Sequence, residues 1–264
     1  MKYKLKIKND ILYLLLLLTV TQFFNYSVLR APLRILILLG IAGLLLLETW
    51  FVRAFRSYSG KKVSKYSDVI IRISLKDRFF GYFILPAIFY VALLFFLFFN
   101  RNEILGYVVL GGCMVLLLVL FLNVKSSLNK LYSLAIATRA IFDFICITIF
   151  YLLLNSYIRI GFGIEMFTIL TILSALVLLV FVLKIHNRLG FIEFLVGVLS
   201  SLVVSFFTIF FWNYNIFVIP AVGALAFYLI ISIWNIRFSG KIKFVDYLLP
   251  FLYVAIAIIL VLNI

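Results

Sequence analysis

Apolar residues in this chain form long unbroken blocks, which short stretches of basic and polar residues separate. Many blocks reach the roughly 20 residues that a helix needs to cross about 30 Å of hydrocarbon. A transmembrane β-barrel would show alternation at every second residue, and runs such as 14–18 and 115–120 are continuously apolar instead. The pattern therefore predicts an all-α, polytopic transmembrane helical bundle.

The blocks predict about nine membrane spans. We place them near residues 11–29, 35–52, 79–99, 104–124, 133–154, 166–183, 190–212, 216–235 and 246–264. The first block follows a lysine-rich start and so resembles a secretory signal, but no small-x-small cleavage site follows it, which favours an uncleaved helix. Residues 1–264 are then expected to form a single integral membrane domain, with residues 53–78 as its basic cytoplasmic loop.

Basic residues decide the predicted orientation. Of the 24 Lys and Arg residues, four fall on one side of these spans, one lies inside a span, and all the others fall on the opposite side. The four are Arg30, Arg34, Arg101 and Arg159. Because cytoplasmic loops collect Lys and Arg, we expect a cytoplasmic N-terminus and an outside C-terminus in a cytoplasmic (inner) membrane. The same rule accounts for the net charge of +15 without a nucleic-acid partner.

Composition narrows the classes of function. The chain is 67% hydrophobic and 12% charged, which is far too apolar for a soluble domain. It lacks the usual phosphate-loop, zinc-protease and nucleophile-elbow patterns, and its nine acidic residues are spread singly. Cys113 and Cys146 lie inside apolar blocks and His186 is the only histidine. We therefore expect no disulfide, metal site or cofactor, name no catalytic residue, and do not favour an enzyme.

An ionisable residue inside a span is the best clue to function, because burying one costs about 3 kcal/mol even on a lenient insertion scale. Asp143 lies about ten residues into the fifth predicted span, which corresponds to a depth of ~15 Å. Arg139 precedes it by one helical turn, so we expect the two to form an intramembrane ion pair. The pair is either structural or part of a pathway for a substrate or ion, and the sequence leaves both open.

Three further acidic residues, Glu48, Glu193 and Asp246, lie within about two turns of inner span ends, where a structural role is favoured. His186 stands between basic residues in a short cytoplasmic turn, and we interpret it as a solvated loop residue rather than a proton relay.

The basic loop predicts contact with anionic lipid headgroups at the cytoplasmic face, because each Lys or Arg there contributes about 1 kcal/mol. The residues concerned are Arg53, Arg56, Lys61, Lys62, Lys65, Arg72, Lys76 and Arg78. A partner protein with an acidic surface is the competing interpretation of the same charge.

The chain also resembles itself. Residues 71–82 and 236–247 share six identical positions, and each copy continues into a span through a proline followed later by Tyr-Val-Ala. Residues 25–32 similarly resemble 213–220. The order and membrane side agree, which predicts that helices 1–3 and 7–9 form a three-helix parallel repeat, with chance similarity in an apolar chain as the alternative.

Three prolines fall within predicted spans of the proposed repeats. Pro86, Pro220 and Pro250 are expected to interrupt their spans, where the freed carbonyls either line a cavity or belong to ordinary kinks.

The C-terminal third, from Trp212-Asn213-Tyr214 to Pro220 and on to Asp246-Tyr247, resembles a domain-of-unknown-function family of multi-pass bacterial membrane proteins. The resemblance implies the same polytopic architecture and carries over no activity.

Three classes of function remain. The favoured one is a non-catalytic membrane scaffold or assembly subunit, whose partners are membrane lipids and other membrane subunits, because polar groups within the spans are scarce. The others are a small transporter or channel-like protein with a pathway near Asp143, and a lipid-modifying membrane enzyme.

Overall fold

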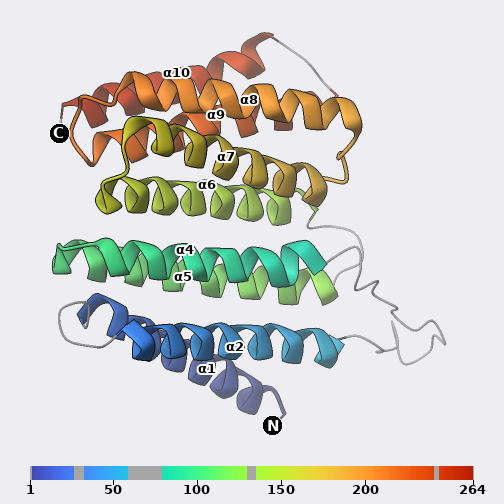
Figure 1. Cartoon of the computed structure of the whole chain (residues 1–264). Coiled ribbons are helices and arrows are strands. Elements are labelled where there is room, and N and C mark those ends of the chain that lie inside the picture. The colour runs from blue at the N-terminus through green and yellow to red at the C-terminus, as the bar shows by residue number, and fades with distance from the viewer. Residues whose placement is uncertain (1, 27–32, 59–78, 130–134, 241–243, 264) are drawn as a thin grey trace. The chain divides into compact units, whose positions relative to one another are not determined.

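The computed structural model describes residues 2–26, 33–58, 79–129, 135–240 and 244–263. All secondary structure in these ranges is helical, as the hydrophobic blocks predicted (Figure 1). The helices are α1 (Lys2–Tyr26), α2 (Leu33–Tyr58), α4 (Leu85–Phe99), α5 (Glu103–Asn129), α6 (Ala135–Ile160), α7 (Ile164–Ile185), α8 (Phe191–Phe210), α9 (Val218–Ser239) and α10 (Phe244–Leu262), and a π-helical turn, η1 (Phe80–Ile84), precedes α4.

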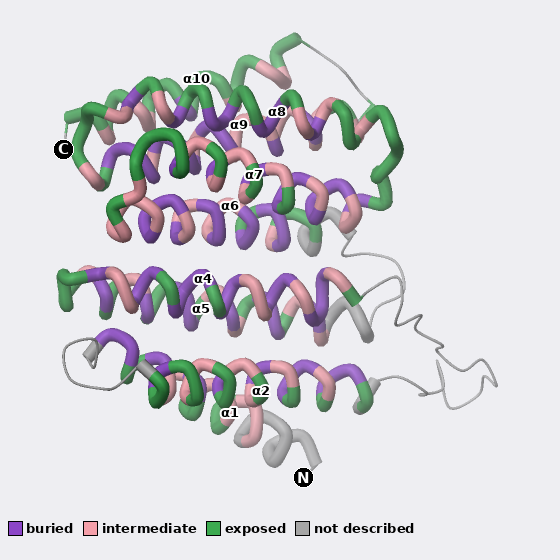
Figure 2. The backbone as a smooth tube through the Cα atoms, in the orientation of Figure 1, coloured by how far each residue is buried: buried purple, intermediate pink, exposed green. Residues whose placement is uncertain are grey.

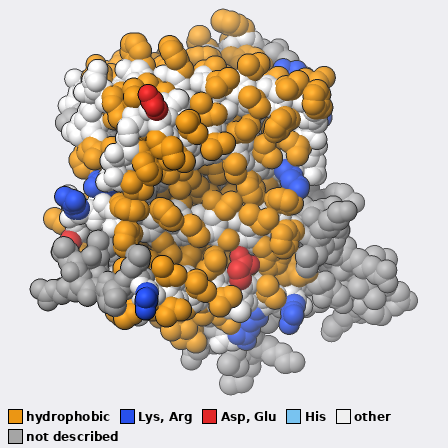
Figure 3. Space-filling model, viewed as in Figure 1, with side chains coloured by type: hydrophobic (Ala, Val, Ile, Leu, Met, Phe, Trp, Pro, Cys, Tyr) orange, Lys and Arg blue, Asp and Glu red, His pale blue; other side chains and the backbone are white. Residues whose placement is uncertain are grey.

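Eight of the described helices are long and apolar enough to cross a membrane, so the chain is a multi-pass membrane protein. The apolar part of α1 is shorter, at Asn9–Asn25. It lies at the lower end of the range of about 17–25 residues that spans adopt. A ninth crossing by α1 therefore stays a prediction. Hydrophobic side chains also cover most of the molecular face in Figure 3, as a lipid-facing surface requires.

The helices form two compact units, Met1–Phe142 and Asp143–Ile264, which are described separately below. The first contains α1, α2, η1, α4, α5 and the beginning of α6, and the second contains the rest of α6 with α7 to α10. We predicted a single membrane domain for residues 1–264. Whether the two units assemble into one domain stays a prediction.

Aromatic side chains hold the first unit together. Trp50 of α2 stacks on Phe121 of α5 with ring centroids 4.1 Å apart, and Phe51 meets the same Phe121 ring edge-on at 5.4 Å. All three side chains are almost completely buried. Because α2 and α5 contribute rings to one stack, the burial of large aromatic surfaces joins helices that are distant in sequence.

Small residues allow close packing in the second unit. A Cβ atom added at Gly223 of α9 would lie 2.5 Å from Leu154 Cδ1 of α6 and 2.9 Å from Thr208 Oγ1 of α8. Helix α9 can therefore approach both neighbours only because this position has no side chain. At its other face α9 packs against α10, where Val222 belongs to a core that Ile258 partly covers.

Exposure differs greatly among the helices. In the candidate span of α10 only 6% of residues are buried, whereas in the span formed by η1 and α4 56% are buried. Figure 2 shows the same contrast between α10 and α4. Helix α10 therefore presents most of its apolar surface outward.

Of the three prolines expected to interrupt their spans, Pro220 differs from the expectation. Pro220 lies in the first turn of α9, where no backbone donor is lost to the helix. Pro86 follows the π-helical turn, in which the Leu85 amide donates to the Phe80 carbonyl, and this wider turn accommodates the proline ring. Pro250 alone lies in the interior of a helix, α10, among the described residues.

The matched repeat segments include residues 71–78 and 241–243, which lie outside the described part of the chain. The internal repeat therefore stays a prediction.

Candidate functional site: a buried carboxyl cluster

Asp143 of α6 lies at the centre of a buried polar cluster in the second unit. His186 Nε2 is 3.1 Å from Asp143 Oδ1, and Asn235 Nδ2 donates a hydrogen bond of 2.8 Å to Asp143 Oδ2. Both carboxyl oxygens are therefore engaged. Asp143 and His186 are only 5% and 7% exposed, so the cluster is well shielded from its surroundings.

Helix ends position these three side chains. His186 is the C-terminal capping residue of α7, and Asn235 lies near the C-terminal end of α9. Asp143 is therefore level with the end of α7, and its expected depth of ~15 Å in the membrane stays a prediction. Helix α6 begins at Ala135, so its first turns extend beyond the level at which α7 ends.

The interpretation of His186 as a solvated loop residue is wrong, since its side chain is buried. The chain reverses directly after it, with Asn187 in the left-handed region at φ 54° and the Arg188 amide donating to the Leu183 carbonyl at 2.9 Å. This turn folds the imidazole inward, where its ring lies 5.8 Å from the Phe238 ring of α9.

The ion pair between Arg139 and Asp143 stays a prediction. Arg139 is exposed, whereas the partners of Asp143 among the described residues are His186 and Asn235.

The secondary acidic residues lie on three separate helices and are half-buried. Glu193 and Asp246 both lie in the first turn of their helices, α8 and α10, where a negative charge interacts favourably with the helix dipole. Glu48 lies in α2 of the first unit.

Two residues of the predicted lipid-contact set, Arg53 and Arg56, are exposed near the C-terminal end of α2. The other six lie outside the described residues: Lys61, Lys62, Lys65, Arg72, Lys76 and Arg78.

Sequence reasoning missed a second carboxyl cluster, which lies in the first unit. Lys125 Nζ of α5 is 2.7 Å from Asp10 Oδ2 of α1, and Trp50 Nε1 donates to Asp10 Oδ1 at 3.3 Å. The side chains of Lys125 and Asp10 are 22% and 23% exposed. No local spacing could have identified this pair, because its members are 115 positions apart.

A third polar group, also missed, lies near the end of α6. Arg159 Nε donates to Asn155 Oδ1 at 2.6 Å, and its guanidinium lies 5.6 Å from the centre of the Phe217 ring. Asn155 Nδ2 and Arg159 Nη2 are buried and have no hydrogen-bond partner in the part of the chain that the structure describes. We predicted that the fifth span ends at 154, before these residues, whereas α6 continues to Ile160. The i,i+4 spacing of Asn155 and Arg159 was the available signal.

The Asp143 cluster can share a proton between a carboxyl group and an imidazole. An ionised carboxylate only accepts hydrogen bonds, so Nε2 of His186 carries the hydrogen whenever Asp143 is ionised. No group of three or more His, Cys, Asp or Glu side chains in the described ranges is arranged to hold a metal ion. The described arrangement thus offers proton exchange or structural pairing as its chemistry.

Comparison with protein-family models, with curated proteins and with solved structures finds no match to this chain.

Proposed function

We propose that this multi-pass membrane protein is a non-catalytic membrane scaffold or assembly subunit. The observation that carries the proposal is the direction of four of its buried hydroxyl groups. Thr21, Ser156, Thr171 and Thr208 each donate to the carbonyl four residues earlier in their own helix. A pathway for a polar solute needs polar groups that are free to bind it along the length of the spans, and these donors are already committed.

Helix α10 is the surface on which we expect a partner helix. It is apolar along its length, its span is only 6% buried, and among the described helices it packs mainly against α9. A scaffold needs such a lateral face, because helices associate within a membrane through close packing of their sides.

The proposal extends to orientation and lipid contact. The distribution of Lys and Arg supports a cytoplasmic N-terminus in an inner membrane, with the C-terminus outside. It also supports binding of the basic loop 53–78 to anionic headgroups.

A second candidate is a small proton-linked transporter or channel-like protein, which the Asp143 cluster favours. A carboxyl group and an imidazole in contact are suited to proton relay. Asn235 Oδ1 beside them is buried and has no hydrogen-bond partner among the described residues, so it offers an acceptor to a passing proton carrier or polar substrate.

Proteoliposomes separate the two candidates. We would measure proton flux through the purified full chain, through Asp143→Asn and through the control Glu165→Gln, whose side chain is exposed in the first turn of α7. The scaffold proposal expects no flux above that of protein-free vesicles for any of the three. Flux that Asp143→Asn abolishes and Glu165→Gln retains would establish the transporter and overturn the scaffold.

Crosslinking in native membranes tests the scaffold directly. Cysteine at Leu260 of α10 should give one discrete adduct, whereas cysteine at Val115 of α5 should give none. The two positions are matched, since their side chains are 62% and 61% exposed. Equal adduct patterns from both sites would mean that α10 has no special lateral contact.

A further inference from the structure

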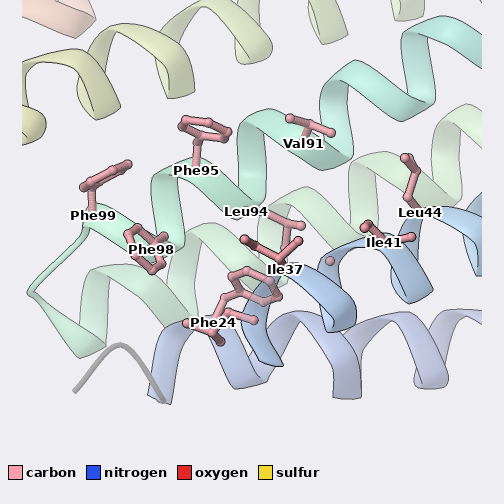
Figure 4. Close-up of a pocket in the computed structure, with 11 residues that line it drawn as sticks. Phe24, Ile37, Ile41, Leu44, Val91, Leu94, Phe95, Phe98 and Phe99 are labelled. Atoms are coloured by element: carbon pink, nitrogen blue, oxygen red, sulfur yellow. The ribbon is translucent and has the colours of Figure 1, made fainter. Parts of the chain in front are cut away.

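The first unit contains an apolar groove of about 330 Å³ between α1, α2 and α4. Its walls include Phe24, Ile37, Ile41, Leu44, Leu94 and Phe98, and Figure 4 shows Phe24, Ile37 and Leu94 converging in it. We propose that this groove binds one acyl chain of a phospholipid, whose phosphate lies beside Arg34. The inference is independent of the scaffold proposal.

The groove has the form that an extended chain requires. Its lining on α2 runs from Leu36 to Leu44, which corresponds to about 12 Å at the usual rise of 1.5 Å per residue. Ile37 and Ile41 are 53% and 50% exposed, so one side of the groove is open. An apolar lining offers a hydrocarbon chain the same dispersion contacts as the lipid around it.

A glycine keeps the floor of the groove free. A Cβ atom at Gly40 of α2 would already lie 3.3 Å from Leu94 Cδ1 and 3.4 Å from Phe24 Cζ. A longer side chain there has to extend into the groove, and so the volume depends on this one position.

Positive charge lies at one end of the groove. Arg34 lies three and seven positions before Ile37 and Ile41, so it shares their face of α2, and its side chain is exposed. Arg101, also exposed, comes two residues after Phe99, which lines the groove near the end of α4. Helical side chains point toward the N-terminus of their helix, so Arg34 extends beyond the groove, where a headgroup phosphate would lie.

A second hollow in the first unit does not combine an apolar lining with positive charge at one end. It has a volume of about 380 Å³ and is lined by Val52, Phe79, Phe83 and Ile84 together with Glu48. A carboxylate in the wall would repel a phosphate, whereas the first groove has guanidinium groups at its end. The charge distribution therefore favours the first groove as the phospholipid site.

Native mass spectrometry of the delipidated full chain tests the proposal, with dioleoyl phosphatidylglycerol and phosphatidylcholine as probes. Gly40→Leu should weaken phosphatidylglycerol binding about tenfold, since a filled groove loses roughly 1.4 kcal/mol of binding. Its matched control is Gly112→Leu on α5, where an added Cβ meets nothing within 4 Å. Ile41→Phe fills the open wall and serves as a second test if Gly40→Leu fails to fold.

The headgroup is tested separately. Arg34→Gln should weaken phosphatidylglycerol binding about fivefold and phosphatidylcholine binding less, because an Arg near an anionic lipid is worth about that factor. Arg188→Gln, at an exposed position directly after α7 in the second unit, is the control and should change neither.

Three outcomes would overturn the proposal. Equal weakening by Gly40→Leu and Gly112→Leu would mean unspecific surface lipid. If Gly40→Leu or Ile41→Phe weakened lipid binding but Arg34→Gln had no effect, the groove would hold an apolar occupant without a phosphate. A disulfide-linked dimer through Ile41→Cys, with binding unchanged in both filled variants, would mean that a second copy of the chain occupies the groove.

Discussion

Each unit contains a carboxyl group that contacts side chains from two other helices. The two carboxyl groups differ in their partners and in their burial. In the first unit Asp10 contacts the amine of Lys125 and the indole of Trp50, and the side chains of Asp10 and Lys125 remain about one-fifth exposed. In the second unit Asp143 contacts His186 and Asn235 and is almost completely buried.

The difference shows how depth of burial selects the partner. A lysine keeps its charge at a half-open site, where surrounding water or headgroups share the cost of desolvation. A buried carboxyl group is better satisfied by an imidazole and an amide, which can bond to it without adding a second permanent charge. The second cluster should therefore depend more strongly on each of its members than the first.

The largest expected effect is an all-or-none difference in the labelling of introduced cysteines. It tests whether the Asp10 and Asp143 clusters lie toward the cytoplasm. Cysteine at Arg101 should react with an impermeant thiol reagent in intact cells, and cysteine at Arg188 should be shielded, because the excess of Lys and Arg marks the side of Arg188 as cytoplasmic. Cys113 and Cys146 are buried and give little background. The reverse labelling pattern would invert the topology of both clusters.

Asp143→Ala should lower the free energy of unfolding by about 3 kcal/mol, because it leaves His186 and the Asn235 amide without their acceptor. Thermal unfolding in detergent measures this as a midpoint about 5–10 °C lower. Arg139→Gln on the same helix is the control, and its exposed position predicts a change within about 0.5 kcal/mol. If Arg139→Gln were as damaging as Asp143→Ala, the ion pair expected from sequence would be the correct description.

Gly223→Ala should destabilise the second unit by about 1–3 kcal/mol, because Leu154 and Thr208 must both move to admit a methyl group. Gly112→Ala in the first unit has open space around it and should instead stabilise α5 by about 0.5–1 kcal/mol. Thermal midpoints of the two variants should shift in opposite directions. Shifts of equal sign would mean that α9 does not approach α6 and α8 as closely as described.

Lys125→Gln should have the smallest effect, about 0.2–1 kcal/mol, because the pair with Asp10 is partly open to its surroundings. The loss should shrink further at high salt, which screens the attraction in the unsubstituted protein. Unfolding midpoints of the unsubstituted protein and of Lys125→Gln, measured at low and at high salt, give both the loss of stability and its dependence on salt. A loss as large as that for Asp143→Ala would remove the distinction between the two clusters.

The helical class, the multi-pass character and most span positions follow from the hydrophobic blocks alone. A hydrophobic run of sufficient length has few structural solutions in lipid, since every backbone group must bond within its own helix. The described helices match the predicted spans closely from the second span onward. The largest differences are at the ends of α2 and α6, which continue to Tyr58 and Ile160 beyond the predicted span ends at 52 and 154. In α6 the added turns contain Asn155 and Arg159, which bond to one another.

The partners of the charged residues were decided only by tertiary structure. Local spacing suggested Arg139 for Asp143, whereas the observed partners are 43 and 92 positions away. Asp10 and Lys125 are likewise brought together by the packing of α1 on α5. Hydrophobicity along one helix determines that it crosses the membrane. Which of its polar side chains face a partner depends on its rotation against neighbouring helices, and that rotation is set by packing at positions such as Gly223 rather than by any local pattern.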